Sequence, residues 1–302
     1  MNPPELPADR RTANGDRRTH AEVDSAGTHV VNPPPDPPPG PLPGLPAGRL
    51  ECATWPEVAV AHPVLVVAVG SCEQHGPHLP LGTDSVIAAA VAERLVAGLE
   101  AADRPAVLAP IISIGASGEH AGFPGTLSFG SAVMEEMVVE LVRSADHFAA
   151  VVIVNGHGGN TAALAAAGER LAAEGRRPVV IPCSFARGDA HAGRTETSVM
   201  LALAPDLVRI DLAEPGAVEG WPELRDRVLA GGVASVSPNG VLGDPTGATA
   251  AEGRSLLDDL VARSLATALA ALNALVDPVD PVDPVDPVAP VAPVAPAARL
   301  HG

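Results

Sequence analysis

The chain has 302 residues, of which 46% are hydrophobic and 2% aromatic, and its formal net charge is -17. Binding to nucleic acid or to an anionic membrane surface needs clustered positive charge, so this balance argues against both partners and favours a neutral or basic substrate. No stretch reaches the roughly 18 uninterrupted apolar residues that would predict a membrane span. The polar N-terminus lacks the apolar core of a signal peptide. The three cysteines have no CxxC spacing, which argues against a disulfide framework and indicates a reducing cytoplasm.

Both ends of the chain are too rich in proline to join a folded core. From Pro33 to Pro46 the sequence reads PPPDPPPGPLPGLP, and from Val276 to Pro296 it repeats VDP and then VAP. Such segments are extended and polyproline-like, so we predict disorder over residues 1–48 and 276–302. The tail is interpreted as a spacer, with a docking motif for a partner as the alternative. Residues 49–275, roughly 225 in number and rich in Ala, Val, Leu and Ile, are enough for one domain with a sizeable core.

Four short apolar runs predict strands buried on both faces, and segments with helical spacing lie between and after them. In chain order, we predict a strand over Val64–Val69, a helix over Ser85–Leu99, a strand over Val107–Ile114, a helix over Ala132–His147, a strand over Val151–Val154, a helix over Thr161–Glu174, a strand over Val179–Pro182 and a late helix over Ala251–Leu275. This alternation is typical of a three-layer α/β/α fold with a mostly parallel sheet. Its ligands bind at the carboxyl ends of the strands.

A polar cluster follows each of the four predicted strands, at the edge where this fold places its site. The clusters are Glu73–His75, Glu119–His120, Asn155–Asn160 and Asp189–Glu196. Ordinary loops are also polar, but they favour Ser, Asp and Lys over repeated His and Glu. The sequence therefore predicts a functional site formed by four loops.

The first cluster belongs to the segment SCEQHGPHLPLGTD, from Ser71 to Asp84. Glu73 and His75, two residues apart in an extended loop, point the same way and are able to share one ion. Asp84, at the start of a helix, is able to bridge to a second ion with its two carboxylate oxygens. The alternative is a capping Asp beside a surface Glu-His pair. The surrounding Pro and Gly residues favour the metal site, because a stiff loop positions ligands.

Two later clusters supply further imidazoles and a carboxylate. In VNGHGGN, His157 lies in a Gly-rich turn where the backbone approaches an ion or a substrate closely, although such a turn at a helix N-terminus also suits a phosphate. In GDAHAGRTETS, His191 and Glu196 are five residues apart, which is too far for one helical face. A loop must therefore hold at least one of them, and the two are free to take different roles as metal ligand and acid-base group.

The motifs EQHGPHLPLGTD, SGEHAGFPGT, NGHGGN and DAHAGRTETS, in this order and spacing, resemble those of the creatininase family. The resemblance covers most of Leu50–Leu272 and implies a hydrolase of non-peptide or unusual amide bonds with two divalent metal ions per chain. It implies that the metal ligands include Glu73, His75, Asp84 and His157.

The resemblance also has one departure. Creatininase itself reads NGHYEN, with a Glu ligand at the position of Gly159 here, so another carboxylate must take its place. Glu196 matches the Glu that many relatives with the NGHGGN turn carry in their HAGxxET motif. His191 matches the family's acid-base residue. The pair Glu119 and His120 is expected to contact substrate, with a capping role as the alternative.

A narrower resemblance comes from ASGEHAGFPGT, GDAHAGRTETSVML and GGVASVSPNGVLGDPTGATAAEG. These segments look like the branch of the family that cleaves the modified mycofactocin precursor peptide and releases its C-terminal product, made from Val and Tyr. The alternatives are a small-molecule amidohydrolase acting on a cyclic amide or formamide, and a catalytically silent protein that binds the precursor. The mixed N/O ligand set suits zinc or iron(II), with manganese as a further choice. The family also implies a homo-oligomer.

Overall fold

The computed structural model describes residues 48–185 and 188–276. The predicted disordered ends lie outside these residues, apart from Gly48 and Val276 at their boundaries, and both remain predictions. Among the described residues no helix combines the length and the apolar character that a membrane crossing requires.

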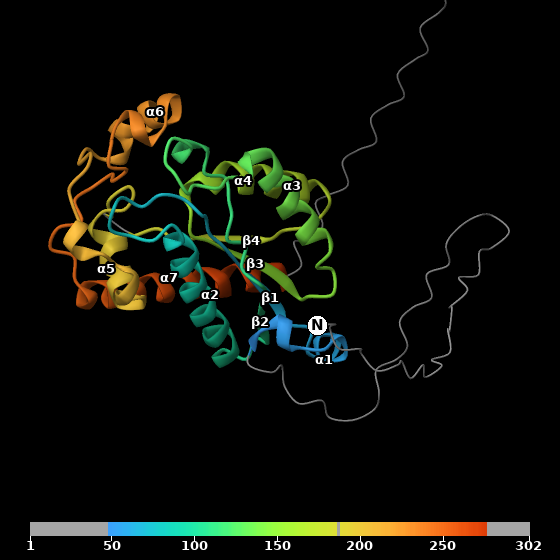
Figure 1. Cartoon of the computed structure of the whole chain (residues 1–302). Helices are drawn as coiled ribbons and strands as arrows, with labels where there is room; N and C mark the ends of the chain where they lie inside the picture. Colours follow the sequence, from blue (N-terminus) through green and yellow to red (C-terminus); the bar gives the residue numbers. More distant parts are fainter. Residues whose placement is uncertain (1–47, 186–187, 277–302) are drawn as a thin grey trace, which may run out of the picture. The chain divides into compact units, whose positions relative to one another are not determined.

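A parallel sheet of four strands forms the centre of the fold (Figure 1). The strands are β1 (Val64–Val69), β2 (Ala106–Leu108), β3 (Ala150–Asn155) and β4 (Val179–Pro182), in the order β2-β1-β3-β4. In the register, Val64 of β1 lies opposite Ala106 of β2 and Ala150 of β3. All six residues of β1 are buried, as expected for a central strand covered on both faces.

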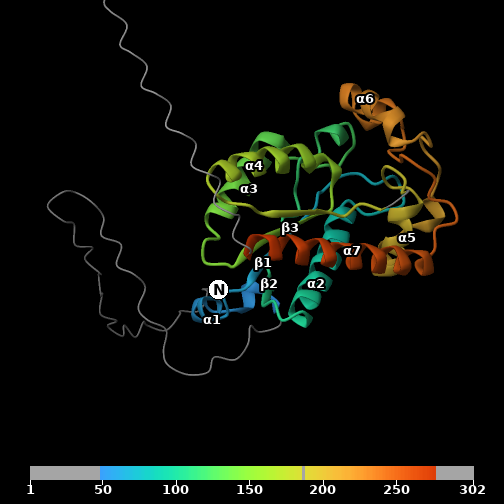
Figure 2. The same cartoon turned by 180° about the vertical axis from the view of Figure 1, so that it is seen from behind.

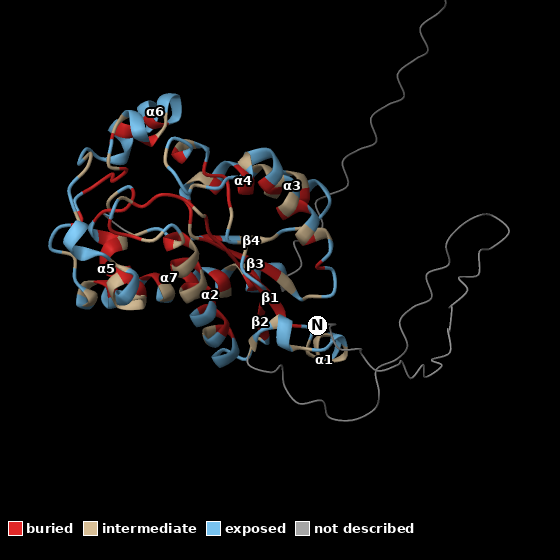
Figure 3. Ribbon diagram, viewed as in Figure 1, coloured by how far each residue is buried: buried red, intermediate tan, exposed pale blue. Residues whose placement is uncertain are grey.

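Helices cover both faces of the sheet, as Figures 1 and 2 show from opposite sides. One core cluster joins alternate β1 residues, Val64, Val66 and Ala68, to α2 (Thr83–Ala101) and α7 (Ala250–Val276). The other cluster joins the intervening β1 residues, Leu65, Val67 and Val69, to α3 (Gly130–Arg143) and α4 (Thr161–Ala173). Each fully buried Val or Leu contributes about 1.5–3 kcal/mol. Figure 3 shows this burial concentrated along the sheet and the inner faces of the helices. The predicted three-layer α/β/α fold is confirmed.

The second strand is shorter than the predicted Val107–Ile114. The regular pairing of this edge strand ends at Leu108. The Ala109 N–H still donates to the Val66 carbonyl, but the next bond to β1 comes three residues later instead of two, so the regular ladder is interrupted around Pro110. The chain stays beside β1 through the bond from the Ile112 N–H to the Ala68 carbonyl. Helix α3 also ends at Arg143 rather than at the predicted His147.

Two short helices were not predicted, α1 (Trp55–Ala61) and α6 (Trp221–Gly231). Thr197 and Ser198 were expected to lead into a helix, and α5 (Arg194–Leu203) begins three residues earlier. The sequence does contain a signal for α1. Thr54 and Glu57 form a capping box, and a Pro stands in its first turn. The two helices that were not predicted are too short for a clear apolar periodicity, which is why the pattern missed them.

Candidate metal centre

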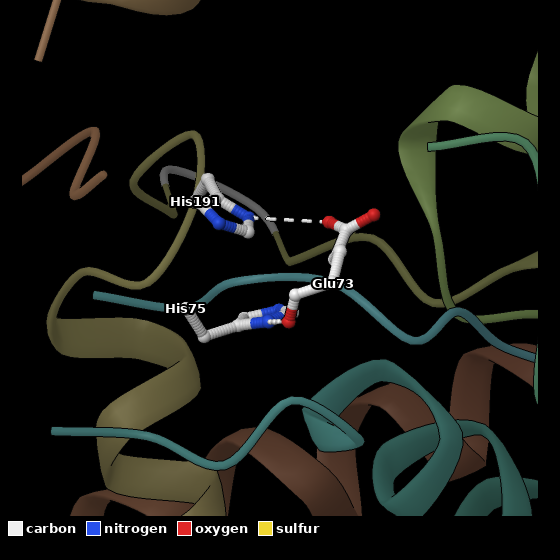
Figure 4. Close-up of side chains that lie close together, drawn as sticks. All are labelled: Glu73, His75 and His191. Atoms are coloured by element: carbon white, nitrogen blue, oxygen red, sulfur yellow. Dashed lines mark hydrogen bonds and ion pairs between the residues drawn. The ribbon is translucent and has the colours of Figure 1, made fainter. Parts of the chain in front are cut away.

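The loops that follow the strands carry a cluster of acidic and imidazole side chains at the carboxyl edge of the sheet. Asp84 lies in the first turn of α2 and Glu196 in the first turn of α5, while His191 lies in the loop before α5. Glu119 and His120 lie in a short 3-10 helix, Gly118–His120. Figure 4 shows the side chains of Glu73 and His191 facing each other, with His75 beside them. The eight side chains that the structure brings together are Glu73, His75, Asp84, Glu119, His120, His157, His191 and Glu196.

Three groups of three side chains have the spacing of metal ligands, and the two considered first share Asp84. In the first group, His157 Nδ1 lies 3.1 Å from Asp84 Oδ2, and His157 Nε2 lies 3.1 Å from Glu73 Oε2. In the second group, His75 Nε2 lies 3.1 Å from Asp84 Oδ1 and 3.9 Å from Glu196 Oε2. Asp84 therefore turns one carboxylate oxygen to each group, which is the arrangement that a bridging ligand needs.

Glu73 provides the test of whether these residues fit a metal ion. It is fully buried, and neither carboxylate oxygen accepts a hydrogen bond of good geometry, although His120 Nε2 lies only 3.2 Å from Oε1. A buried carboxylate without well-aligned donors is costly, and burial raises the pKa of Glu73 to about 8. A cation between Glu73 and its neighbours removes that cost, so the donor set fits a divalent metal ion.

The charges of the cluster follow from burial and from the carboxylates. Burial opposes a charged His75, but Asp84 beside the ring raises its pKa to about 10. His157 is likewise buried, and Glu73 and Asp84 raise its pKa to about 9. Burial raises the pKa of Glu196 to about 7. Without an ion, protons on the two imidazoles therefore balance the carboxylates.

The two remaining imidazoles are neutral. Burial, and then the positive charge of His157, lower the pKa of His120 to about 3. Burial, and then His75, hold the pKa of His191 well below its usual range. The ring centroids of His120 and His191 lie 4.6 Å apart. The cluster thus contains two charged and two uncharged imidazoles at neutral pH.

Hydrogen bonds from outside the two groups orient the candidate ligands. The Ser71 hydroxyl donates to Asp84 Oδ2 at 2.8 Å, and the Ala192 N–H donates to Glu196 Oε2 at 2.6 Å. The His75 Nδ1–H donates to the main-chain carbonyl of Glu73 at 3.1 Å, which leaves Nε2 free for an ion. Such partners hold a ligand in position. Ser71 was not singled out in the sequence, although its place directly after β1 was a signal.

The packing around Gly159 accounts for the departure from NGHYEN. A Cβ there would lie 2.3 Å from Glu119 Oε1 and 2.4 Å from both the Ala116 carbonyl oxygen and His157 Nε2. These separations are far below contact distance, so no side chain fits. The third carboxylate of the two groups is instead that of Glu196, on α5.

His191 and Glu119 stand at the margin of the two groups. His191 Nδ1 lies 3.8 Å from Glu73 Oε1, and with Glu73 and His75 it forms a third group of ligand spacing. The geometry therefore allows His191 as an acid-base group or as a ligand. Glu119 Oε1 lies 3.5 Å from His157 Nε2, and its side chain is 24% exposed, so it reaches both the cluster and solvent.

The comparisons with known proteins agree with this geometry. Residues 51–268 match the family model described as "Creatininase: Creatinine amidohydrolase". The mycofactocin precursor peptide peptidase of Mycolicibacterium smegmatis is 54% identical over 201 residues, covering 66% of this chain and 81% of that protein. Its counterpart from Mycobacterium tuberculosis is 48% identical over 226 residues, covering 72% and 90%. A solved structure, "Creatininase Mn", is 25% identical with a TM-score of 0.60, and the match covers 76% of this chain and 99% of that one. The chain therefore belongs to the creatininase family of metal-dependent amide hydrolases.

Proposed function

We propose that this chain is a peptidase that cleaves the modified mycofactocin precursor peptide and releases its C-terminal product, which is made from Val and Tyr. The observation that carries the proposal is the 54% identity over 81% of a protein named as that peptidase. The segment Gly231–Gly253, one of the three that carry the narrower resemblance, also lies against the candidate centre. In it, the Leu242 N–H donates to the His191 carbonyl at 2.8 Å.

We propose that two divalent ions bind per chain, zinc or iron(II) first and manganese as a further choice. Glu73, Asp84 and His157 would hold one, and His75, Asp84 and Glu196 the other. When bound, such ions would lower the pKa of a water to about 7 and polarise the carbonyl of the scissile amide.

His191 is proposed as the acid-base group. Its ring is buried and uncharged at neutral pH, and Nδ1 faces Glu73 at 3.8 Å. It is therefore placed to take a proton from the attacking water and to give it to the departing amine, a contribution of about 10²- to 10⁴-fold in rate. Glu119 and His120 are proposed to contact substrate, because Glu119 bridges the cluster and solvent.

The alternatives of a small-molecule amidohydrolase and a silent precursor-binding protein are not favoured. The two relatives with 48–54% identity are named for the precursor peptide, whereas the creatininase structure is 25% identical. A silent protein would be expected to lose candidate ligands that this chain retains. The described cysteines are free, which fits the proposed cytoplasmic location. A homo-oligomer is proposed from the family resemblance alone, and sedimentation equilibrium tests it.

Single-turnover cleavage of the modified precursor, followed by mass spectrometry, tests the proposed function. We expect release of the C-terminal product, with slow or no turnover of the unmodified peptide and of creatinine. Turnover of creatinine without cleavage of the modified precursor would overturn the proposal.

Elemental analysis tests the metal content. We expect close to two divalent ions per chain and loss of activity on chelation. Full activity of a rigorously metal-free sample would rule out the metal mechanism. A single tightly held ion would remove either Glu73 or Glu196 from the ligand set.

A further inference from the structure

Gln74 lies between the candidate ligands Glu73 and His75 in the sequence, and its side chain contacts neither of the two groups that share Asp84. It is 5% exposed and contacts loops that are far apart in the sequence. Its amide nitrogen lies 2.9 Å from His120 Nδ1, 3.0 Å from His191 Nε2 and 3.0 Å from the Gly240 carbonyl oxygen. Its amide oxygen accepts the Gly76 N–H at 2.9 Å.

The last contact fixes which end of the amide is oxygen. With the amide reversed, its NH₂ would face the Gly76 N–H and its oxygen would face the Gly240 carbonyl, so that donor would meet donor and acceptor would meet acceptor. The NH₂ therefore faces His120, His191 and Gly240.

Counting hydrogens then assigns the two imidazoles. The NH₂ has two hydrogens for three neighbours. His191 Nε2 also lies 2.9 Å from the main-chain carbonyl oxygen of Gln74, which needs a donor. If the His191 Nε2–H donates to that oxygen, the two amide hydrogens go to His120 Nδ1 and the Gly240 carbonyl, and every group is satisfied. If His191 Nε2 were an acceptor, three acceptors would compete for two hydrogens, and the Gln74 carbonyl would lose this donor.

We infer that Gln74 is a positioning residue that sets both His120 and His191 in the Nε2–H tautomer, with opposite nitrogens turned toward Glu73. His120 accepts at Nδ1 and so has its proton on Nε2, which lies 3.2 Å from Glu73 Oε1. His191 donates from Nε2 and so has a free lone pair on Nδ1, which lies 3.8 Å from the same oxygen. Glu73 Oε1 therefore lies near an N–H donor, His120 Nε2, and near a proton acceptor, His191 Nδ1. Resting on the proposed function, this pairing assigns His120 to the amide oxygen of the substrate and His191 to the attacking water.

Gly240 holds Gln74 in this position from the other side. Its φ is +81°, and a Cβ there would lie 1.8 Å from the amide oxygen of Gln74. Any side chain at residue 240 would displace Gln74. The segment Gly231–Gly253 thus acts on His120 and His191 through the side-chain amide of Gln74.

The tautomers can be read directly by ¹⁵N NMR of the zinc-loaded protein labelled at its ten histidines. Spectra of His120→Asn and His191→Asn supply the assignments. We expect both residues to be neutral and protonated on Nε2 in the wild type. A proton on Nδ1 of His120 would overturn the inference, whether or not the protein cleaves the precursor. The expected tautomers in a protein without peptidase activity would instead overturn only the proposed function.

Gln74→Glu keeps the shape of the side chain but cannot donate to His120 Nδ1. We expect the proton of His120 to move to Nδ1 or both nitrogens to become protonated. Loss of a hydrogen bond that orients a site residue typically lowers activity by this much, so kcat should fall about 10- to 100-fold while KM and zinc content change little. Gln74→Met, which lacks both donor and charge, should give a mixture of His120 tautomers. An unchanged His120 signal in Gln74→Glu would contradict the assignment, even if the activity were lost.

A matched pair of glycine variants separates this contact from loop strain. Gly240→Ala should reproduce the His120 signal of Gln74→Met. Gly247 has a similar φ of +74° in the same segment, but a Cβ there approaches only Arg194 Nη1, at 3.1 Å. Gly247→Ala should leave the His120 signal as in the wild type. The same change in both variants would show that loop strain, and not Gln74, governs His120.

Discussion

Glu196 and His191 belong to one short motif, yet the structure gives them different surroundings. Glu196 Oε2 faces His75 at 3.9 Å, whereas His191 Nδ1 faces Glu73 at 3.8 Å. Glu196→Gln keeps the size of the side chain and removes a charge that offsets an ion, so metal affinity should fall and excess metal should partly restore the rate. His191→Ala should keep both ions and lose about 10²- to 10⁴-fold in kcat, with no rescue by metal.

Metal analysis and single-turnover cleavage, run in parallel on the two variants, check this prediction. His191 also has the spacing of a metal ligand to Glu73 and His75, so the experiment is able to show that His191 is the ligand instead. Loss of an ion from His191→Ala, with both ions kept by Glu196→Gln, would exchange the two roles.

The same residues predict how metal binding depends on pH. The metal-free pKa values of His75, His157 and Glu73 are about 10, 9 and 8, so at neutral pH these groups hold protons that an ion must displace. Apparent affinity should therefore rise with pH between about 6 and 8, roughly tenfold per unit for each proton released. Calorimetry in buffers of different ionisation enthalpy measures the proton release. Binding at pH 7 without proton release would contradict these protonation states.

Among the elements, the turn between β3 and α4 has no room for a carboxylate side chain at Gly159, and α5 carries the candidate ligand Glu196. Gly159→Ala should place a methyl group against Glu119, Ala116 and His157, destabilise the protein by about 1–3 kcal/mol and weaken metal binding. Gly158 is the matched control, because a Cβ there meets nothing within 4 Å. Thermal unfolding and elemental analysis of the two variants should differ clearly. Equal effects would mean that the turn tolerates a side chain at Gly159 as well as it does at Gly158.

For the molecule as a whole, the candidate centre is built from residues between Glu73 and Glu196, closed by the segment around Gly240. Deleting residues 277–302 removes no candidate ligand and begins where helix α7 ends. Turnover and metal content should therefore stay almost unchanged, as expected for a solvated polyproline spacer. Steady-state kinetics of the truncated protein measure this. A large loss of turnover would indicate that the tail docks on the domain or on a partner.

The sequence by itself determined the layered fold, because a strand covered on both faces must be apolar throughout. The bounds of β1 were predicted to the residue for that reason. The bounds of β4 were also predicted, but Val180 is 38% exposed, so the prediction that this strand is buried on both faces is wrong. The edge strand was predicted too long, because an apolar run does not show where the regular hydrogen bonding to the neighbouring strand stops. The candidate ligands were also found, because their types and spacing repeat a family motif.

Only the tertiary structure decided how these ligands divide and what holds them. That Asp84 turns one oxygen to each group, and that Gly159 has no room for a side chain, depend on contacts between separate loops. The contacts of Gln74 span 46, 117 and 166 positions along the chain. The hydrophobic periodicity and the composition of a segment reflect contacts within one helix or strand. A hydrogen bond between distant loops leaves no such local pattern. The protonation of His120 and His191 therefore appears only when the loops are brought together.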